Sequence, residues 1–158
     1  MTMNISELVR GGTLCLSKAG LAEGTNDHTV KIAADNGAGV DFAIDGLLYH
    51  KVTTDNIDPT ECDEQALGTT CLYLVTLTST GTLDTIKGTE VDNDDLSAGN
   101  TVLQWPQPAA STCPIGAIKI ATGTTAFQVG VDDLTDDIGT GTVTYYDLLA
   151  VPPGPLTS

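Results

Sequence analysis

The fold of this chain is decided by residues 40–50, which read Val40-Asp41-Phe42-Ala43-Ile44-Asp45-Gly46-Leu47-Leu48-Tyr49-His50. Before the turn the side chains alternate, so the apolar positions 40, 42 and 44 share one face of an extended strand. Asp-Gly is among the strongest short signals for a β-hairpin, because glycine readily adopts the positive φ that the turn requires. The stretch therefore predicts a hairpin whose return strand covers residues 47–53.

The same design occurs twice more. Residues 70–78 lead to a turn at Thr80-Gly81, and residues 115–122 lead to a turn at Gly123 with a return strand through Phe127 and Val129. Residues 71–75 are apolar on both faces, which is typical of a central strand that is covered on two sides. We predict two further hairpins, and in the last of them positions 118, 120, 127 and 129 face the core.

Fold class follows from these hairpins and from further strand patterns at residues 13–16, 29–34 and 142–149. No helical period exceeds about two turns, and no change of composition divides the 158 residues. We predict an all-β protein: a single compact β-sandwich or β-barrel-like domain over residues 13–151. Residues 1–12 form an N-terminal arm in this prediction, and the Pro-rich residues 152–158 form an extended C-terminal tail.

Charge restricts the class of partner. Twenty-one acidic residues oppose six basic ones, for a net charge of −15. Such a surface repels phosphate backbones and anionic lipid, so we expect neither nucleic acid nor membrane as a partner. The first ten residues lack the basic start and apolar centre of a signal peptide, which favours synthesis in a cytoplasm.

Cysteine and acidic residues give no clear metal or catalytic signature. A Cys62–Cys71 disulfide stays open, although a cytoplasmic origin disfavours it. The acidic run at 92–95 begins like a calcium loop, but Leu96 follows where an oxygen ligand belongs. His28 and His50 have no zinc-site spacing, and no serine lies in a nucleophile-elbow motif. We therefore expect no metal, no cofactor and no enzymatic activity.

Two segments are candidates for an interface with a partner. Trp105, with Pro106 beside it, is either a rigid interface anchor or a plug at the edge of its own core. The N-terminal arm poses the same choice between disorder and contact with a neighbour. Its candidate contact residues are Ile5, Leu8, Val9 and Arg10.

Three segments carry a resemblance to a known group of proteins. Residues 43–49 read Ala-Ile-Asp-Gly-Leu-Leu-Tyr, residues 71–75 read Cys-Leu-Tyr-Leu-Val and continue to Ile-Lys-Gly-Thr-Glu at 86–90, and residues 114–122 read Pro-Ile-Gly-Ala-Ile-Lys-Ile-Ala-Thr. In this order, over residues 40–147, they resemble the small β-rich virion proteins of tailed bacteriophages known as head decoration or cement proteins.

The resemblance implies a structural protein on the exterior of a bacteriophage capsid, made in the host cytoplasm. The partner it implies is the major capsid protein, and the oligomer it favours is a homotrimer. It supplies no site residues, because such proteins act through surfaces.

Two other functions remain as alternatives. The Thr- and Gly-rich loops are compatible with a tail or head-fibre module that binds host-surface glycans. A hydrolase with a carboxylate site built from loops would use the four acids Asp132, Asp133, Asp136 and Asp137.

Overall fold

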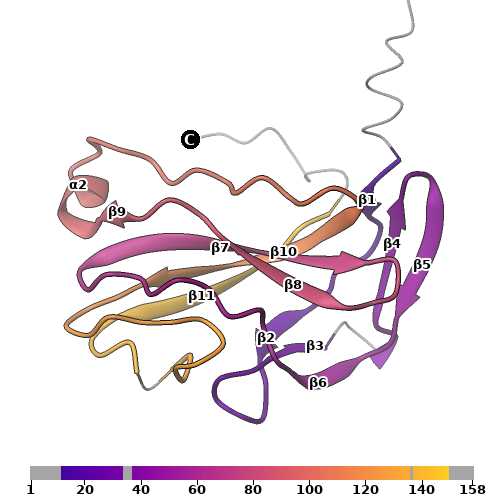
Figure 1. The fold of residues 1–158 in the computed structure, drawn as a ribbon, viewed down its shortest axis with the longest axis horizontal. Helices are drawn as coiled ribbons and strands as arrows, with labels where there is room; N and C mark the ends of the chain where they lie inside the picture. The colour runs from indigo at the N-terminus through magenta and orange to yellow at the C-terminus, as the bar shows by residue number, and fades with distance from the viewer. Residues whose placement is uncertain (1–11, 34–36, 136, 150–158) are drawn as a thin grey trace, which may run out of the picture.

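The computed structural model describes residues 12–33, 37–135 and 137–149. Strands make up 43% of the described residues and helix 4%, and the strands form three antiparallel sheets, so the all-β prediction is confirmed (Figure 1). The predicted arm, residues 1–12, lies outside this description except for Gly12. The predicted tail, residues 152–158, lies wholly outside it.

The first sheet has the strand order β1–β4–β5 and contains the hairpin predicted at residues 40–53. β1 spans Leu14–Cys15, β4 spans Val40–Ile44 and β5 spans Leu47–Lys51. In the turn, Asp45 has φ 52° and Gly46 has φ 80°, which is the pair of positive angles that a two-residue type I′ turn needs. The Asp-Gly signal therefore identified both the turn and the register of this hairpin.

The largest sheet has the order β11–β10–β7–β8, with β9 pairing with the start of β7. These strands span Thr142–Asp147 (β11), Thr112–Ala121 (β10), Thr69–Thr78 (β7), Leu83–Lys87 (β8) and Val91–Asp92 (β9). The hairpin predicted at Thr80-Gly81 joins β7 to β8 and is confirmed. Every residue of β7 from Thr70 to Leu77 is buried, as expected for a central strand covered on both faces.

The third predicted hairpin, with its turn at Gly123, is wrong. β10 pairs with β7 on one side and with β11 on the other, which leaves no edge for a return strand through Phe127. Residues 123–141 instead form a long connection that buries Phe127, Val129 and Leu134, with Phe127 bridging to Gln65. The apolar residues of this connection alternate with polar ones because one side of it packs on the core. The same alternation is typical of a strand, which is why a strand was predicted here.

The third sheet has the order β2–β3–β6. β2 spans Leu21–Glu23, β3 spans Val30–Ile32 and β6 spans Thr54–Ile57. No strand was predicted from the sequence at residues 54–57, so β6 was missed. Its sequence is polar and Asn56 has φ 53°, which breaks the regular strand pattern at an exposed edge.

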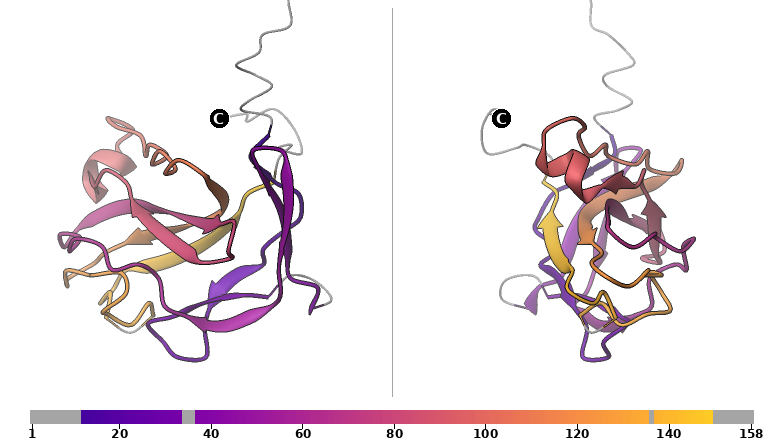
Figure 2. Two further views of the ribbon diagram at one scale, coloured as in Figure 1. Left: turned by 45° about the vertical axis from the view of Figure 1, so that its right-hand side comes forward. Right: turned by 90° about the vertical axis from the view of Figure 1, so that its left-hand side faces the viewer.

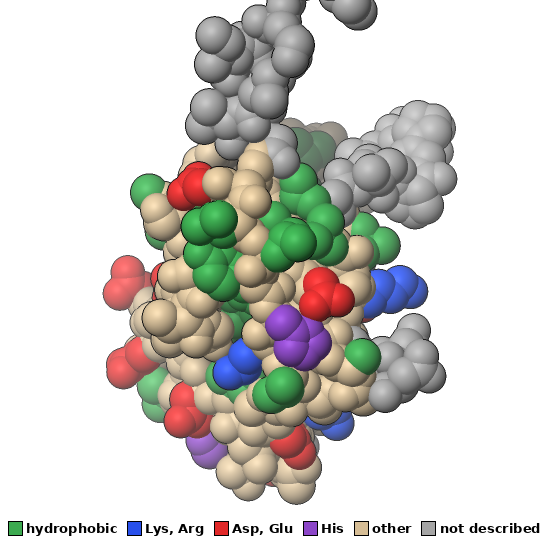
Figure 3. All heavy atoms as spheres, turned by 90° about the vertical axis from the view of Figure 1, so that its right-hand side faces the viewer, with side chains coloured by type: hydrophobic (Ala, Val, Ile, Leu, Met, Phe, Trp, Pro, Cys, Tyr) green, Lys and Arg blue, Asp and Glu red, His purple; other side chains and the backbone are tan. Residues whose placement is uncertain are grey.

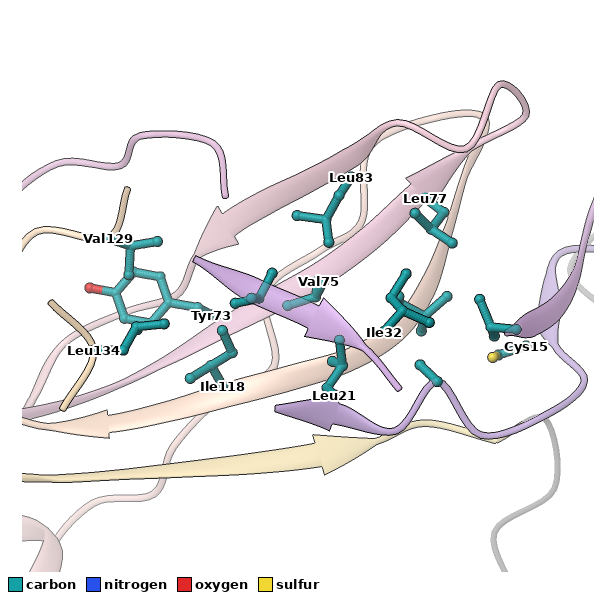
Figure 4. Packing of buried hydrophobic residues seen from close by; sticks show 14 of the residues in the cluster. Cys15, Leu21, Ile32, Tyr73, Val75, Leu77, Leu83, Ile118, Val129 and Leu134 are labelled. Carbon is teal, nitrogen blue, oxygen red and sulfur yellow. The ribbon is translucent and has the colours of Figure 1, made fainter. Parts of the chain in front are cut away.

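One hydrophobic core is shared by all three sheets. Figure 2 shows the sheets arranged around a common interior, and Figure 4 shows side chains from each of them meeting there. Contributors to this core include Cys15 from the first sheet, Ile32 from the third, Tyr73 and Ile118 from the largest, and Leu134 from the long connection.

Candidate functional site

The candidate site lies on the strap, which we define as residues 101–110 between helix α2 (Asn93–Ser97) and β10. The acidic run that resembles a calcium loop in fact begins this helix. Asp92 Oδ1 accepts hydrogen bonds from Asp94 N at 2.8 Å and from Asp95 N at 3.4 Å, as an N-cap residue does. Gly99, with φ 73°, ends the helix and directs the chain into the strap.

Pro106 fixes the strap to the body of the protein. Its side chain is buried, and a Cβ added at Gly88, just after β8, would lie only 3.1 Å from Pro106 Cγ. Near the other end of the strap, Thr112 Oγ1 donates a hydrogen bond to Ala109 O at 2.8 Å. Within the described parts of the chain, no backbone-to-backbone hydrogen bond involves residues 101–110. The strap is therefore held by side-chain packing, and it runs above β7 and β8 in Figure 1.

Trp105 lies on the solvent side of this anchored segment. Its side chain is 50% exposed, and that of Val102 is 70% exposed. The structure places Trp105 half-exposed beside the buried Pro106, and the two roles that the sequence left open for Trp105, an interface anchor or a plug at the edge of its own core, both stay predictions. Because the neighbouring proline is buried and its φ angle is fixed, the backbone that carries this exposed aromatic ring has little conformational freedom.

A hollow of about 290 Å³ lies between the strap and the start of α2. Its lining is formed mainly by polar side chains, together with the apolar Val91 and Val102. The lining residues are Thr89, Glu90, Val91, Asp92, Asp95, Thr101, Val102 and Gln104.

Glu90 at this hollow is paired with Lys87. Glu90 Oε1 lies 2.6 Å from Lys87 Nζ, and its Oε2 accepts a hydrogen bond from Ala66 N at 3.0 Å. Burial raises the pKa of Glu90, but the hydrogen bond and charge of Lys87, with the bond from Ala66, outweigh it and lower the pKa below its usual value. Lys87 Nζ also donates to the carbonyls of Asp63 and Glu64 at 2.9 and 2.7 Å. The pair thus ties an acidic loop to β8.

Two acids of the possible carboxylate site, Asp132 and Asp137, accept hydrogen bonds from the backbone of their own loop. Asp132 Oδ2 accepts a hydrogen bond from Gln128 N at 2.6 Å, and Asp137 Oδ2 accepts one from Asp133 N at 2.9 Å. Asp136 lies outside the described residues. Among the described residues, no three or more His, Cys, Asp or Glu side chains form a group that could hold a metal ion.

The histidines and cysteines take ordinary positions. His50 Nδ1 lies 2.7 Å from Asp41 Oδ1, and His28 Nε2 lies 3.7 Å from Asp58 Oδ1. All four cysteines of the sequence are described and free, so the Cys62–Cys71 disulfide that the sequence left open is not formed.

A second apolar surface was missed by the sequence reasoning. The outer face of the first sheet presents Leu48, 75% exposed, and Leu16, 47% exposed. Figure 3 shows hydrophobic side chains gathered on this side of the molecule, beside a histidine and an acidic side chain. The register that follows from the Asp-Gly turn places Leu48 opposite Ala43 on the face away from Phe42. The Asp-Gly turn fixes this register, so the sequence contained the information that Leu48 lies on the outer face. The prediction did not extend the register into the return strand.

The four candidate residues of the N-terminal arm, Ile5, Leu8, Val9 and Arg10, lie outside the described residues. The structure therefore places Trp105 and Pro106 and leaves the arm prediction as it stands.

Comparison of the chain with protein-family models, with curated proteins and with solved structures finds no match. In the described part of the chain, no helix has the length and apolar character needed to cross a membrane. The fold and the surfaces above are thus the basis for a functional proposal.

Proposed function

We propose that this protein is a structural virion protein that binds the outer surface of a bacteriophage capsid and stabilises it, with the Trp105 strap as its contact surface. The observation that carries the proposal is the half-exposed indole of Trp105 on a segment anchored by the buried Pro106. The resemblance of residues 40–147 to head decoration proteins supports it. In this proposal the partner is the major capsid protein, and the protein acts as a homotrimer on the capsid exterior.

A rigid exposed tryptophan suits such a role for a physical reason. Aromatic residues dominate the binding energy of many protein interfaces, because they bury a large area with few rotatable bonds. Pro106 restricts the backbone beside Trp105, so little freedom is lost when the ring is covered. A protein that binds only the mature shell stabilises that state by mass action.

Substitution of Trp105→Ala tests the proposal. We expect co-sedimentation with capsids that lack the protein to weaken by about 30-fold, the effect of losing one interface hot spot of about 2 kcal/mol. Val131→Ala is the matched control, because Val131 is 53% exposed but lies on the connection between β10 and β11. Both substitutions are at exposed sites, so thermal unfolding should change little.

Two results would reject the proposal. The first is that the unaltered protein fails to associate with capsids at all. The second is that Trp105→Ala and Val131→Ala weaken binding equally, which would leave capsid binding in place but remove the strap as its contact.

The polar hollow beside the strap favours one alternative, a tail or head-fibre module that binds host-surface glycans. Amide, hydroxyl and carboxylate groups there could hydrogen-bond to sugar hydroxyls. In that case Gln104→Ala should abolish binding to a glycan array and leave co-sedimentation with capsids unaltered. Absence of glycan binding by the unaltered protein removes this alternative.

A further inference from the structure

The outer edge of β5 has backbone groups that no described strand pairs with. β5 is the last strand of the first sheet and lies at the right-hand side of Figure 1. Ile44 and Leu47 flank the two-residue turn and exchange backbone hydrogen bonds, and every second residue of β5 then bonds to β4. The N–H and C=O groups of Leu48 and His50 therefore point away from β4. Within the described parts of the chain, no backbone-to-backbone hydrogen bond from outside the sheet involves residues 47–51.

The other outer strands are covered, short or irregular. Lys87 of β8 donates to the carbonyl of Asp63, which holds a loop beside that strand. Asp147 of β11 accepts a hydrogen bond from Leu21 N of β2 at 3.1 Å. β6 is interrupted by the positive φ of Asn56, while β1 and β2 have only two and three residues. Proteins protect sheet edges in these ways because an open edge pairs with other chains. β5 has no such cover among the described residues.

Charge also distinguishes β5 from the other outer strands. Each of β2, β6, β8 and β11 contains one acidic residue, whereas β5 contains none and carries Lys51. Charges farther away than the Debye length of about 8 Å are largely screened at physiological ionic strength. Two copies of a chain with net charge −15 therefore repel each other least where their β5 strands meet.

We infer that the edge of β5 pairs with β5 of a second copy of the chain, antiparallel and about a two-fold axis. In this pairing Leu48 lies opposite His50 of the second copy, so the outward N–H and C=O groups of both residues find partners. Tyr49 lies at the axis, opposite itself, and the contact is the same for both copies. It uses no residue of the strap, and because it joins copies two by two, it would link neighbouring trimers of the proposed function.

The free backbone groups select this register. A shift of two residues in one direction would bring His50 opposite Gly46, whose N–H is already bonded to Gly12 O at 2.7 Å. A shift in the other direction would bring the two His50 side chains opposite each other. Only the register centred on Tyr49 avoids both problems.

The side chains are complementary in this register. Leu47, which is 63% exposed, lies opposite Lys51 of the second copy, and the aliphatic part of that lysine can cover it. The Lys51 side chains do not face each other, so they do not oppose the pairing. Each of them instead lies towards the turn residue Asp45 of the other copy, which has the opposite charge.

Charge substitution at Leu47 tests the inference by sedimentation equilibrium of the full chain. Leu47→Glu places a carboxylate opposite Lys51 of the second copy and should strengthen self-association by about 5-fold, because the axis repeats the ion pair. Leu47→Lys should weaken it by about 5-fold. Net charge alone predicts the reverse order, since glutamate adds to the negative charge of the protein and lysine reduces it.

Val131→Glu and Val131→Lys are the matched controls, because Val131 is 53% exposed on the connection between β10 and β11. There we expect only the small effect of net charge. The inference is overturned if the two Leu47 variants follow the same order as the Val131 variants. It is also overturned if the unaltered protein has the mass of a monomer or a homotrimer at every concentration.

Amide hydrogen exchange followed by NMR tests the register without any substitution. The amides of Leu48 and His50 should exchange at least about 10-fold more slowly at high protein concentration than at low concentration. The amides of Leu47 and Tyr49 are already bonded to β4, so they should change little. Slow exchange of Leu48 and His50 at every concentration would reject the inference, because another segment of the same chain would then cover the edge.

Discussion

Gln65 is a polar side chain at full burial, and its hydrogen bonds explain how the core accepts it. Its Nε2 donates to Thr69 O at 3.0 Å and to Ile120 O at 3.1 Å, and its Oε1 accepts from Tyr73 OH at 3.0 Å. Burial raises the pKa of Tyr73 above its usual value, so the phenol remains a proton donor. The side-chain amide of Gln65 thus forms hydrogen bonds with groups from β7 and β10. The backbone of the same residue pairs with Phe127 of the long connection.

Substitution of Gln65→Ala should lower the free energy of unfolding by about 2–4 kcal/mol. The reason is that the change leaves a cavity and removes the partner of the buried Tyr73 hydroxyl. Urea denaturation measures the effect. In a Tyr73→Phe background the same substitution should cost about 1 kcal/mol less, because no hydroxyl is then left without a partner. Equal costs in both backgrounds would show that the bond between these side chains contributes nothing.

At the scale of elements, the junction between sheets depends on Gly116. β10 has a bulge between Pro114 and Gly116, which accommodates a proline inside a paired strand. A Cβ at Gly116 would lie 2.2 Å from Leu21 Cδ1 of β2 and 2.5 Å from Tyr146 O of β11. Glycine is therefore required by close packing, which brings β2 onto the β10–β11 pair.

Substitution of Gly116→Ala should destabilise the protein by about 2–3 kcal/mol, as overpacking in a core does. Chemical denaturation followed by circular dichroism measures the loss. Leu21→Ala in the same chain removes one of the two contacts, so the double variant should be more stable than the sum of the two single effects predicts. A loss of less than about 0.5 kcal/mol for Gly116→Ala would contradict this prediction. It would show that β2 can move away from the β10–β11 pair at little cost in free energy.

The elements differ in how far the sequence could predict them. The β4–β5 and β7–β8 hairpins followed from local signals, a glycine turn between regular strands. The pairing of β10 with β11 did not, because it depends on a contact across residues 122–141 and on competition for the edge of β10. β6 and α2 were missed because a polar edge strand and a five-residue helix capped by Asp92 have little apolar periodicity.

The candidate site was predictable in part for the same reason. Trp105 and Pro106 were identified from residue type, since a lone tryptophan beside prolines is unusual. Which of the two is buried depends on the long-range contact between Pro106 and Gly88, which no local pattern contains. Likewise, the exposure of Leu48 depends on which elements pack against the first sheet, and no local pattern contains that information.

At the scale of the whole molecule, buried thiols make stability depend on alkaline pH. Burial raises the pKa of Cys15 and of Cys71 from the usual 9.0 to about 11, and that of Cys113 to about 12. Well below pH 9 these thiols are protonated in both the folded and the unfolded chain. Above pH 9 the unfolded chain loses protons that the folded chain keeps, so the free energy of unfolding falls as pH rises towards 11.

Urea denaturation between pH 8 and pH 11 should therefore show a steep loss of stability. Each buried thiol contributes up to about 1.4 kcal/mol per pH unit between its unfolded and folded pKa. Cys71→Ala should reduce this slope by one such contribution, whatever its cost at pH 8. Identical slopes for the variant and the unaltered protein would show that Cys71 ionises equally in both states.

Because Trp105 is the only tryptophan in the sequence, the strap carries its own optical label. Its indole is half in water, so its emission should be red-shifted and open to collisional quenching in the free protein. Acrylamide is the appropriate quencher, because it is neutral, whereas iodide is kept away by a charge of −15. Any ligand, glycan or capsid fragment that covers the strap would shift this emission to the blue. Binding at this surface can thus be followed in unmodified protein, at low concentration and in real time.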